Sequence, residues 1–179
     1  MRLLIVINSF WPGFKGGGPR ESLLHLLKEI DYTVYVFTRS FEPDGQTLDV
    51  TPDRWVDWTL NTNIKIFYSS SKGLKYYYEL FKALTNIKPD IVWLNSFFDF
   101  SNSFIPQIIS FLLGISICIS PRGEFLKGNL STKSTRKKLF LKIYKIFEFF
   151  CPRIYHFTYE DELKESAKYI SVKSHFIWD

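Results

Sequence analysis

Short apolar runs alternate with amphipathic segments along most of the chain. Residues 3–7 form an unbroken apolar run, which predicts a strand buried on both faces. Residues 19–30 place leucines on one stripe and begin at Pro19 after Gly18, a pattern typical of a helix start. A turn-rich interval at 40–61 predicts a long loop that carries Trp55 and Trp58. Further strands are predicted at 32–38, 64–68, 91–95, 115–120, 154–157 and 175–178, and further helices at 74–84, 103–113, 134–150 and 158–169, the last capped by Thr158.

This alternation predicts an α/β protein with a doubly wound parallel sheet, right-handed connections and helices on both faces, a Rossmann-like arrangement. The length of 179 residues fits a single domain over 1–179. Ligands of such sheets bind outside the carboxyl ends of the strands, where the strand order reverses. We therefore expect functional residues in three segments that follow strands, at 8–18, 96–102 and 121–129.

Composition narrows the class of protein. Hydrophobic residues make up 46% and charged residues 23%, which excludes a disordered or fibrous chain. Cys118 and Cys151 are too few for a disulfide scaffold and form no CxxC motif, so we expect a reducing, cytoplasmic location without structural zinc. The longest apolar stretch, at 108–119, is interrupted and shorter than the roughly 20 residues that span a bilayer.

Positive charge is concentrated in one part of the chain. Eight Lys and Arg lie between Arg122 and Lys145 against one acid, whereas the whole chain has a net charge of +5. Within the predicted helix at 134–150, Lys138, Lys142 and Lys145 share one face. Apolar residues share another side of this helix, namely Leu139, Phe140, Ile143, Ile146, Phe147 and Phe150.

Two interpretations of this helix stay open. It can lie on an anionic lipid surface, as basic amphipathic helices do. Alternatively it packs on the sheet and exposes its lysines to water, which is the commoner case. The lipid interpretation requires exposed apolar residues beside the lysines, and the pattern offers Leu141 and Tyr144 for this role.

Three consecutive glycines, Gly16, Gly17 and Gly18, lie between the first predicted strand and the first predicted helix. Glycine allows close backbone approach and a helix start offers free N–H groups, so the segment favours phosphate or diphosphate binding. The alternative is a flexible bend that only permits tight helix–sheet packing. A nicotinamide dinucleotide site is disfavoured, because Glu21 stands where G-x-G-x-x-G requires its third glycine and the second strand does not end in an acid.

A second candidate segment, Ser120-Pro121-Arg122-Gly123-Glu124-Phe125, follows the strand predicted at 115–120. Arg122 and Glu124 either face a ligand or form an exposed ion pair, and the basic residues continue to Lys127. The three histidines are scattered without metal-ligand spacing, and the chain lacks a nucleic-acid recognition motif. We therefore expect neither a bound metal nor a nucleic-acid partner.

Five segments follow one another in an order and spacing that is informative as a set. They are Asn8-Ser9-Phe10-Trp11-Pro12, Gly16-Gly17-Gly18-Pro19-Arg20-Glu21-Ser22, Pro89-Asp90-Ile91-Val92-Trp93-Leu94-Asn95, Ser120-Pro121-Arg122-Gly123-Glu124 and His156-Phe157-Thr158-Tyr159-Glu160-Asp161-Glu162. Taken together, over essentially the whole chain, they resemble the N-terminal half of a family 4 glycosyltransferase of the GT-B fold.

The resemblance implies metal-independent transfer of a sugar, with retention, from a nucleotide-sugar donor to a glycan or lipid-linked acceptor. Gly16, Gly17 and Gly18 would approach the donor diphosphate, and Arg122 and Glu124 would form the catalytic loop. Many relatives carry His where Arg122 stands. Residues facing the acceptor or an anionic membrane would be Lys127, Lys138, Lys142 and Lys145.

In such enzymes a second domain binds most of the nucleotide, and the reaction occurs in the cleft between the two domains. The resemblance therefore implies a truncated chain or a separately encoded C-terminal half, with little transfer by these 179 residues alone. We expect Gly17, Gly18 and Arg122 to line one shared hollow. The alternative function is a non-catalytic module, which binds an acceptor or attaches to the inner face of a membrane.

Overall fold

The computed structural model describes residues 1–126, 128–129 and 134–177. The chain is an α/β protein with a Rossmann-like arrangement, and its strand pairing is mostly parallel. It divides into two compact units, Met1–Trp93 and Leu94–Asp179. The sequence-based α/β class is thus confirmed.

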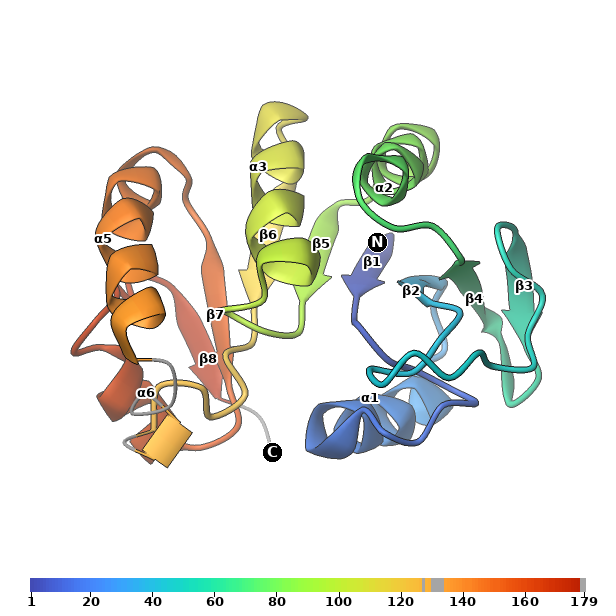
Figure 1. Ribbon diagram of the computed structural model, residues 1–179, viewed down its shortest axis with the longest axis horizontal. Coiled ribbons are helices and arrows are strands. Elements are labelled where there is room, and N and C mark those ends of the chain that lie inside the picture. The colour runs from blue at the N-terminus through green and yellow to red at the C-terminus, as the bar shows by residue number, and fades with distance from the viewer. Residues whose placement is uncertain (127, 130–133, 178–179) are drawn as a thin grey trace. The chain divides into compact units, whose positions relative to one another are not determined.

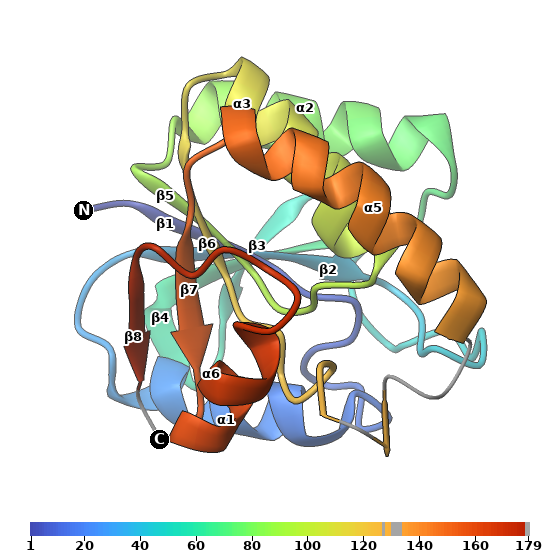
Figure 2. The same cartoon turned by 90° about the vertical axis from the view of Figure 1, so that its left-hand side faces the viewer.

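The first unit has its strands in the order β3-β4-β2-β1-β5. Strand β2 is parallel to both β1 and β4, whereas β3 is antiparallel to β4. Helices α1 and α2 cover opposite faces of these strands (Figures 1 and 2). The elements in chain order are β1 (Leu3–Val6), α1 (Gly17–Glu29), β2 (Val34–Arg39), β3 (Trp55–Trp58), β4 (Asn61–Ser69), α2 (Leu74–Ile87) and β5 (Ile91–Leu94).

The second unit places its later strands in the order β6-β7-β8, all parallel. Helices α3 and α5 lie on one face of these strands and α6 on the other (Figures 1 and 2). Its elements are the π-helical turn η1 (Phe100–Phe104), α3 (Ile105–Leu112), β6 (Ser116–Ile119), α5 (Ser134–Phe150), β7 (Ile154–Phe157), α6 (Glu160–Ser166) and β8 (His175–Ile177).

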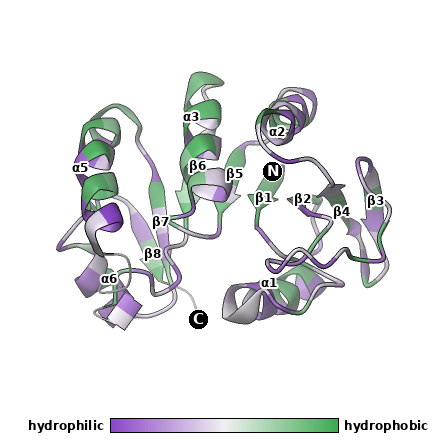
Figure 3. Cartoon of the chain, viewed as in Figure 1, coloured by the Kyte–Doolittle hydropathy of each residue, from purple (hydrophilic) through white to green (hydrophobic). Residues whose placement is uncertain are grey.

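Apolar strands form the centre of each unit, as their unbroken apolar runs predict. All four residues of β1 are buried, and the ribbons of β1 and β5 are hydrophobic in Figure 3. The leucine stripe of α1 is buried as expected, with Leu23 and Leu27 fully enclosed. Continuous burial of a strand on both faces is typical of parallel sheets whose two faces carry helices.

The loop predicted at 40–61 is partly wrong, because β3 lies within it and pairs with β4. Aromatic packing explains the strand: the Trp55 ring contacts those of Tyr35 and Phe67, each with centroids 5.4 Å apart. Trp58 is buried against Phe10. Cross-strand aromatic pairs of this kind stabilise a sheet edge despite the surrounding turn residues.

The predicted cap of the last helix is also wrong. Helix α6 begins at Glu160 and ends at Ser166, and its N-cap is Tyr159 rather than Thr158. The backbone N–H and the hydroxyl of Thr158 both donate to the buried carboxylate of Glu162, at 2.9 Å each. The Thr158 hydroxyl therefore bonds to this carboxylate instead of capping the helix.

The face of α5 that packs inward centres on Tyr144, which is fully buried, with Leu141 beside it. The Tyr144 ring lies 4.5 Å from that of Phe97, and its hydroxyl donates to the side-chain oxygen of Gln107. Leu141 and Tyr144 therefore cannot be the exposed apolar residues that the sequence offered for lipid contact. The large apolar residues that are exposed on α5 are instead Leu139, Ile143, Ile146, Phe149 and Phe150.

This orientation predicts a large and a small effect for two aliphatic residues of α5 that lie two positions apart. Leu141→Ala should lower the free energy of unfolding by about 2–5 kcal/mol, because it leaves a cavity under a buried side chain. Ile143→Ala should change it by less than about 0.5 kcal/mol, since Ile143 is more than half exposed. Urea unfolding monitored by circular dichroism measures both values, and the reverse ranking would show that the helix is rotated.

Candidate functional site

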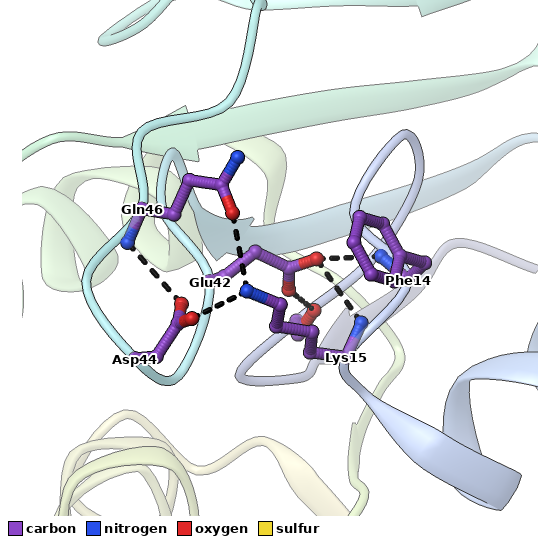
Figure 4. A network of polar contacts seen from close by, with 6 residues as sticks. Phe14, Lys15, Glu42, Asp44 and Gln46 are labelled. Carbon is purple, nitrogen blue, oxygen red and sulfur yellow. Dashed lines mark hydrogen bonds and ion pairs between the residues drawn. The ribbon is translucent and has the colours of Figure 1, made fainter.

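The loop that follows β1 is held by one buried carboxylate, that of Glu42 (Figure 4). Glu42 accepts a hydrogen bond from the Ser9 hydroxyl at 2.8 Å and from the backbone N–H groups of Phe14 and Lys15 at 2.6 and 3.0 Å. Burial alone would raise the pKa of this carboxyl, but the hydrogen bonds from Phe14, Ser9 and Lys15 outweigh it and lower the pKa. An ionised carboxylate therefore fixes the segment that leads to the glycines.

The start of α1 is open to a ligand. Gly16 occupies the N-cap position without a side-chain hydrogen bond, and Gly17 has a positive φ of 65°. A Cβ added at Gly17 or Gly18 would meet nothing within 4 Å, whereas one at Gly16 would lie 3.0 Å from the Cβ of Arg20. Gly16 thus permits tight packing, and Gly17 and Gly18 leave space beside N–H groups that no side chain caps.

Arg20 is a candidate that the sequence analysis did not single out. Its residue is 6% exposed, and its Nε has no hydrogen-bond partner. Its Nη1 pairs with Glu21, whose side chain is largely exposed. A buried cation in the first turn opposes the helix dipole, which favours acids there, so Arg20 is electrostatically suited to a bound anion. The sequence signal was a basic residue at the helix start, where acids are usual.

The loop that follows β6 adopts an unusual backbone conformation, with φ of 53° at Arg122 and 74° at Gly123. A non-glycine residue with such a φ requires support from its surroundings. The buried carboxylate of Glu162 supplies that support, because it accepts a hydrogen bond from the backbone N–H of Gly123. This carboxylate is the one that also holds Thr158.

Glu124 braces the neighbouring loop after β5. Its carboxylate accepts hydrogen bonds from the Ser96 hydroxyl at 2.7 Å and from the N–H groups of Phe97 and Phe98 at 2.6 and 2.9 Å. Burial raises the pKa of Glu124, and the hydrogen bonds from Ser96, Phe98 and Phe97 offset this only in part. The contacts make Glu124 a positioning residue, and a catalytic role for it stays a prediction.

Arg122 reaches the end of β5, where its Nη2 and Nε donate to Oδ1 of Asn95 at 2.9 and 3.3 Å. Burial lowers the pKa of the Arg122 guanidinium, an effect that the nearby Glu162 carboxylate opposes. Asn95 is buried, and its Nδ2 lacks a hydrogen-bond partner. A buried unpaired donor of this kind requires an explanation, such as a bound ligand or water. Sequence reasoning placed Asn95 at a strand end without giving it a role.

The remaining predicted residues divide as follows. Lys138, Lys142 and Lys145 are exposed on α5, and Lys127 lies outside the described residues. Gly16–Gly18 belong to the first unit, and Arg122 and Glu124 belong to the second. The shared hollow expected for Gly17, Gly18 and Arg122 stays a prediction.

A serine–histidine pair that the sequence did not reveal joins the ends of β6 and β7. Ser120 Oγ lies 2.7 Å from Nδ1 of His156, and both residues are almost completely buried. This enclosure suits a bracing role rather than attack on a substrate. Among residues 1–126, 128–129 and 134–177, no three His, Cys, Asp or Glu side chains gather as metal ligands. Nor does any helix in the described part of the chain have the length and apolarity needed to span a bilayer.

No family model matches the sequence, and no curated protein matches it. The likeness to family 4 glycosyltransferases therefore remains a resemblance carried by the quoted segments. What the structure establishes independently is the α/β arrangement and the local geometry of the loops after β1, β5 and β6.

The lowered pKa of Glu42 predicts a pH-dependent contribution to stability. The contribution is complete above the usual glutamate pKa of about 4.3 and disappears as the pH falls through the lower folded-state pKa. Glu42→Gln should therefore lower the free energy of unfolding by about 1–3 kcal/mol at pH 7, and the difference from wild type should shrink towards pH 3.

Urea unfolding across this pH range measures the effect, with Glu29→Gln, an exposed acid on α1, as the matched control. A difference between Glu42→Gln and wild type that does not vary with pH would contradict an ionised, hydrogen-bonded Glu42.

Proposed function

We propose that this chain is the N-terminal type of domain of a retaining GT-B glycosyltransferase. It would take part in moving a sugar from a nucleotide-sugar donor to a glycan or lipid-linked acceptor, without a metal, at the inner face of a membrane. The observation that carries the proposal is the start of α1, where open glycines and uncapped N–H groups adjoin the buried cation of Arg20.

The chemistry of the donor suits this arrangement. A nucleotide sugar carries a diphosphate, whose oxygens accept hydrogen bonds from backbone N–H groups at a helix start. Gly17 and Gly18 give such a group room to approach, and Arg20 adds positive charge that Glu21 balances only from an exposed position. The loop after β1 does not need to rearrange to receive a ligand, because Glu42 already holds it.

The loop after β6 supports the transfer half of the proposal. Arg122 is a half-buried cation, and the unpaired Nδ2 of Asn95 is a donor close to it. Donors of this type stabilise charge that develops on a departing diphosphate or orient sugar hydroxyls. Glu162 would act indirectly, by fixing the backbone at Gly123 beside Arg122, and Glu124 would do so by fixing the neighbouring loop at Phe97.

The alternative function, a non-catalytic module that binds an acceptor or attaches to a membrane, is favoured by the exposed apolar residues of α5. The resemblance implies that a second domain binds most of the nucleotide. Binding by this chain is therefore the first quantity to measure, and turnover is the second.

A matched pair of glycines tests the diphosphate site. Gly17 and Gly114 have φ of 65° and 68°, and neither would bring a Cβ within 4 Å of another atom. Alanine at either position should lower stability by about 1–2 kcal/mol through the same backbone strain. Gly17→Ala should also weaken binding of uridine or guanosine diphosphate about tenfold, measured by isothermal titration calorimetry. Equal affinities for the two variants would remove Gly17 from the site.

Transfer itself is tested with a panel of nucleotide sugars, by release of nucleoside diphosphate with and without a candidate donor-binding domain. Arg122→Ala should slow release about 10²-fold, because it removes a donor to the leaving group. Lys168→Ala, an exposed change elsewhere in the same unit, should leave the rate unchanged. If no panel member reacts under either condition, the non-catalytic alternative is favoured.

A further inference from the structure

The outward face of α5 carries a continuous apolar stripe. Leu139, Ile143, Ile146 and Phe150 are spaced at i, i+4, i+7 and i+11, so they align along one side of the helix. They are between 54% and 69% exposed, and Phe149 beside them is 85% exposed. Figure 3 shows hydrophobic and hydrophilic segments alternating along this helix. Four large apolar side chains on one exposed helix face exceed the isolated exposed residues that need no explanation, and Phe149 adds a fifth on the adjoining, lysine-bearing face.

This stripe is distinct from the face that α5 uses to pack on its own unit. Tyr144 and Leu141 form the buried face, and Tyr144 contacts the rings of Phe97 and Phe140. At about 100° per residue, Leu141 lies roughly opposite the stripe and Tyr144 lies beside Leu141, about 130° from the stripe. The helix therefore has two apolar faces, and only one of them packs against the core of its unit.

Lysines border the stripe along one side. Lys138, Lys142 and Lys145 are exposed and repeat at i, i+4 and i+7. Glu148 is the acidic residue of this helix, and its hydrogen-bond partners are not lysines. It accepts hydrogen bonds from the Ser171 N–H at 2.8 Å and from the Tyr155 hydroxyl at 3.3 Å. The lysine row thus faces solvent without an acid of the same helix to neutralise it.

The apolar surface continues beyond α5 within the second unit. The Phe147 ring contacts Phe111 at the end of α3, with centroids 6.1 Å apart, and the next residue, Leu112, is 76% exposed. A hollow of about 500 Å³ opens beside the C-terminal end of α5, and Lys145, Glu148, Phe149 and Lys173 contribute to its wall. Apolar side chains and lysines therefore remain together over more than one element.

We infer that α5 docks in the plane of an anionic bilayer, with the stripe in the acyl boundary and the lysine row at the lipid phosphates. Interfacial helices combine these two features, and their apolar face enters the boundary by about 5–10 Å. A protein partner fits less well, since the cores of protein interfaces are depleted in lysine. Docking of α5 would hold the domain where lipid-linked acceptors lie, and only this purpose of the docking rests on the proposed function.

Co-sedimentation with vesicles tests the docking surface. The chain should bind vesicles of phosphatidylcholine mixed with phosphatidylglycerol more tightly than phosphatidylcholine alone, and added salt should reduce the difference. Ile143→Ser combined with Ile146→Ser should weaken binding about tenfold or more, because both side chains leave the acyl boundary. Lys138→Glu, Lys142→Glu and Lys145→Glu together should weaken binding to the anionic vesicles about 100-fold or more.

A control with the same change in charge separates docking from general electrostatics. Lys28→Glu, Lys75→Glu and Lys82→Glu alter exposed helical lysines of the first unit. This variant should keep most of the vesicle affinity. If it loses as much affinity as the α5 variant, net charge rather than this surface causes binding, and the inference fails.

An environment-sensitive label reports whether the stripe enters the bilayer. Ile146→Cys carrying a nitrobenzoxadiazole group should shift to shorter emission wavelengths on anionic vesicles, whereas the same label at Thr51→Cys should not. Cys118 and Cys151 are buried, and burial raises the pKa of Cys118 to about 12, so the native thiols should remain unlabelled. No shift at position 146 during vesicle binding would overturn insertion of the stripe.

Other occupants of the stripe give different results. Self-association that rises with concentration and disappears in the Ile143→Ser, Ile146→Ser variant, without vesicle binding, would assign the face to a second copy and overturn the inference. That variant should still bind nucleoside diphosphates as wild type does. Vesicle binding without nucleotide binding would therefore sustain the docking surface while the glycosyltransferase proposal fails, and the converse result would reject the docking surface alone.

Discussion

Buried and half-buried carboxylates that accept hydrogen bonds from backbone N–H groups determine the shape of the loops after the strands. Glu42 holds the loop that leads to the glycines in the first unit. In the second unit, Glu124 holds residues 97 and 98, and Glu162 holds Gly123. A carboxylate with several such donors fixes a loop that has no regular secondary structure of its own. The candidate functional groups depend on these anchors more than on the strands themselves.

The anchors leave other polar groups without equivalent partners. The first turn of α1 has uncapped N–H groups and a buried arginine, and Asn95 has an unpaired donor beside Arg122. Satisfied carboxylates and unsatisfied donors thus occur in the same loops. This combination is expected where a scaffold is rigid before an anionic or hydroxyl-rich ligand arrives, because preorganised donors lose little entropy on binding.

Helix α5 shows how packing chooses between two apolar faces. Aliphatic residues are more numerous on the outward face, yet the inward face is the one that carries Tyr144. The Tyr144 ring contacts Phe97, and the Tyr144 hydroxyl hydrogen-bonds with Gln107 and Tyr155. Both contacts form only when this side chain is buried. Ring packing and hydrogen bonding at Tyr144, rather than the number of apolar residues, therefore decide which face of α5 is buried. The other apolar face, which lysines border, stays exposed for another partner.

The sequence by itself determined the α/β class, because uninterrupted apolar runs and amphipathic segments have periods that only buried strands and covering helices satisfy. It located the helix at Ser134–Phe150 and the strand at Ile154–Phe157 to the residue, and it placed glycines and Arg122 after strands. Tertiary structure alone decided the strand at Trp55–Trp58, the buried face of α5, and the roles of Glu42, Glu162 and Asn95. Each of these depends on contacts between residues distant along the chain, and local periodicity carries no information about which partners such contacts bring together.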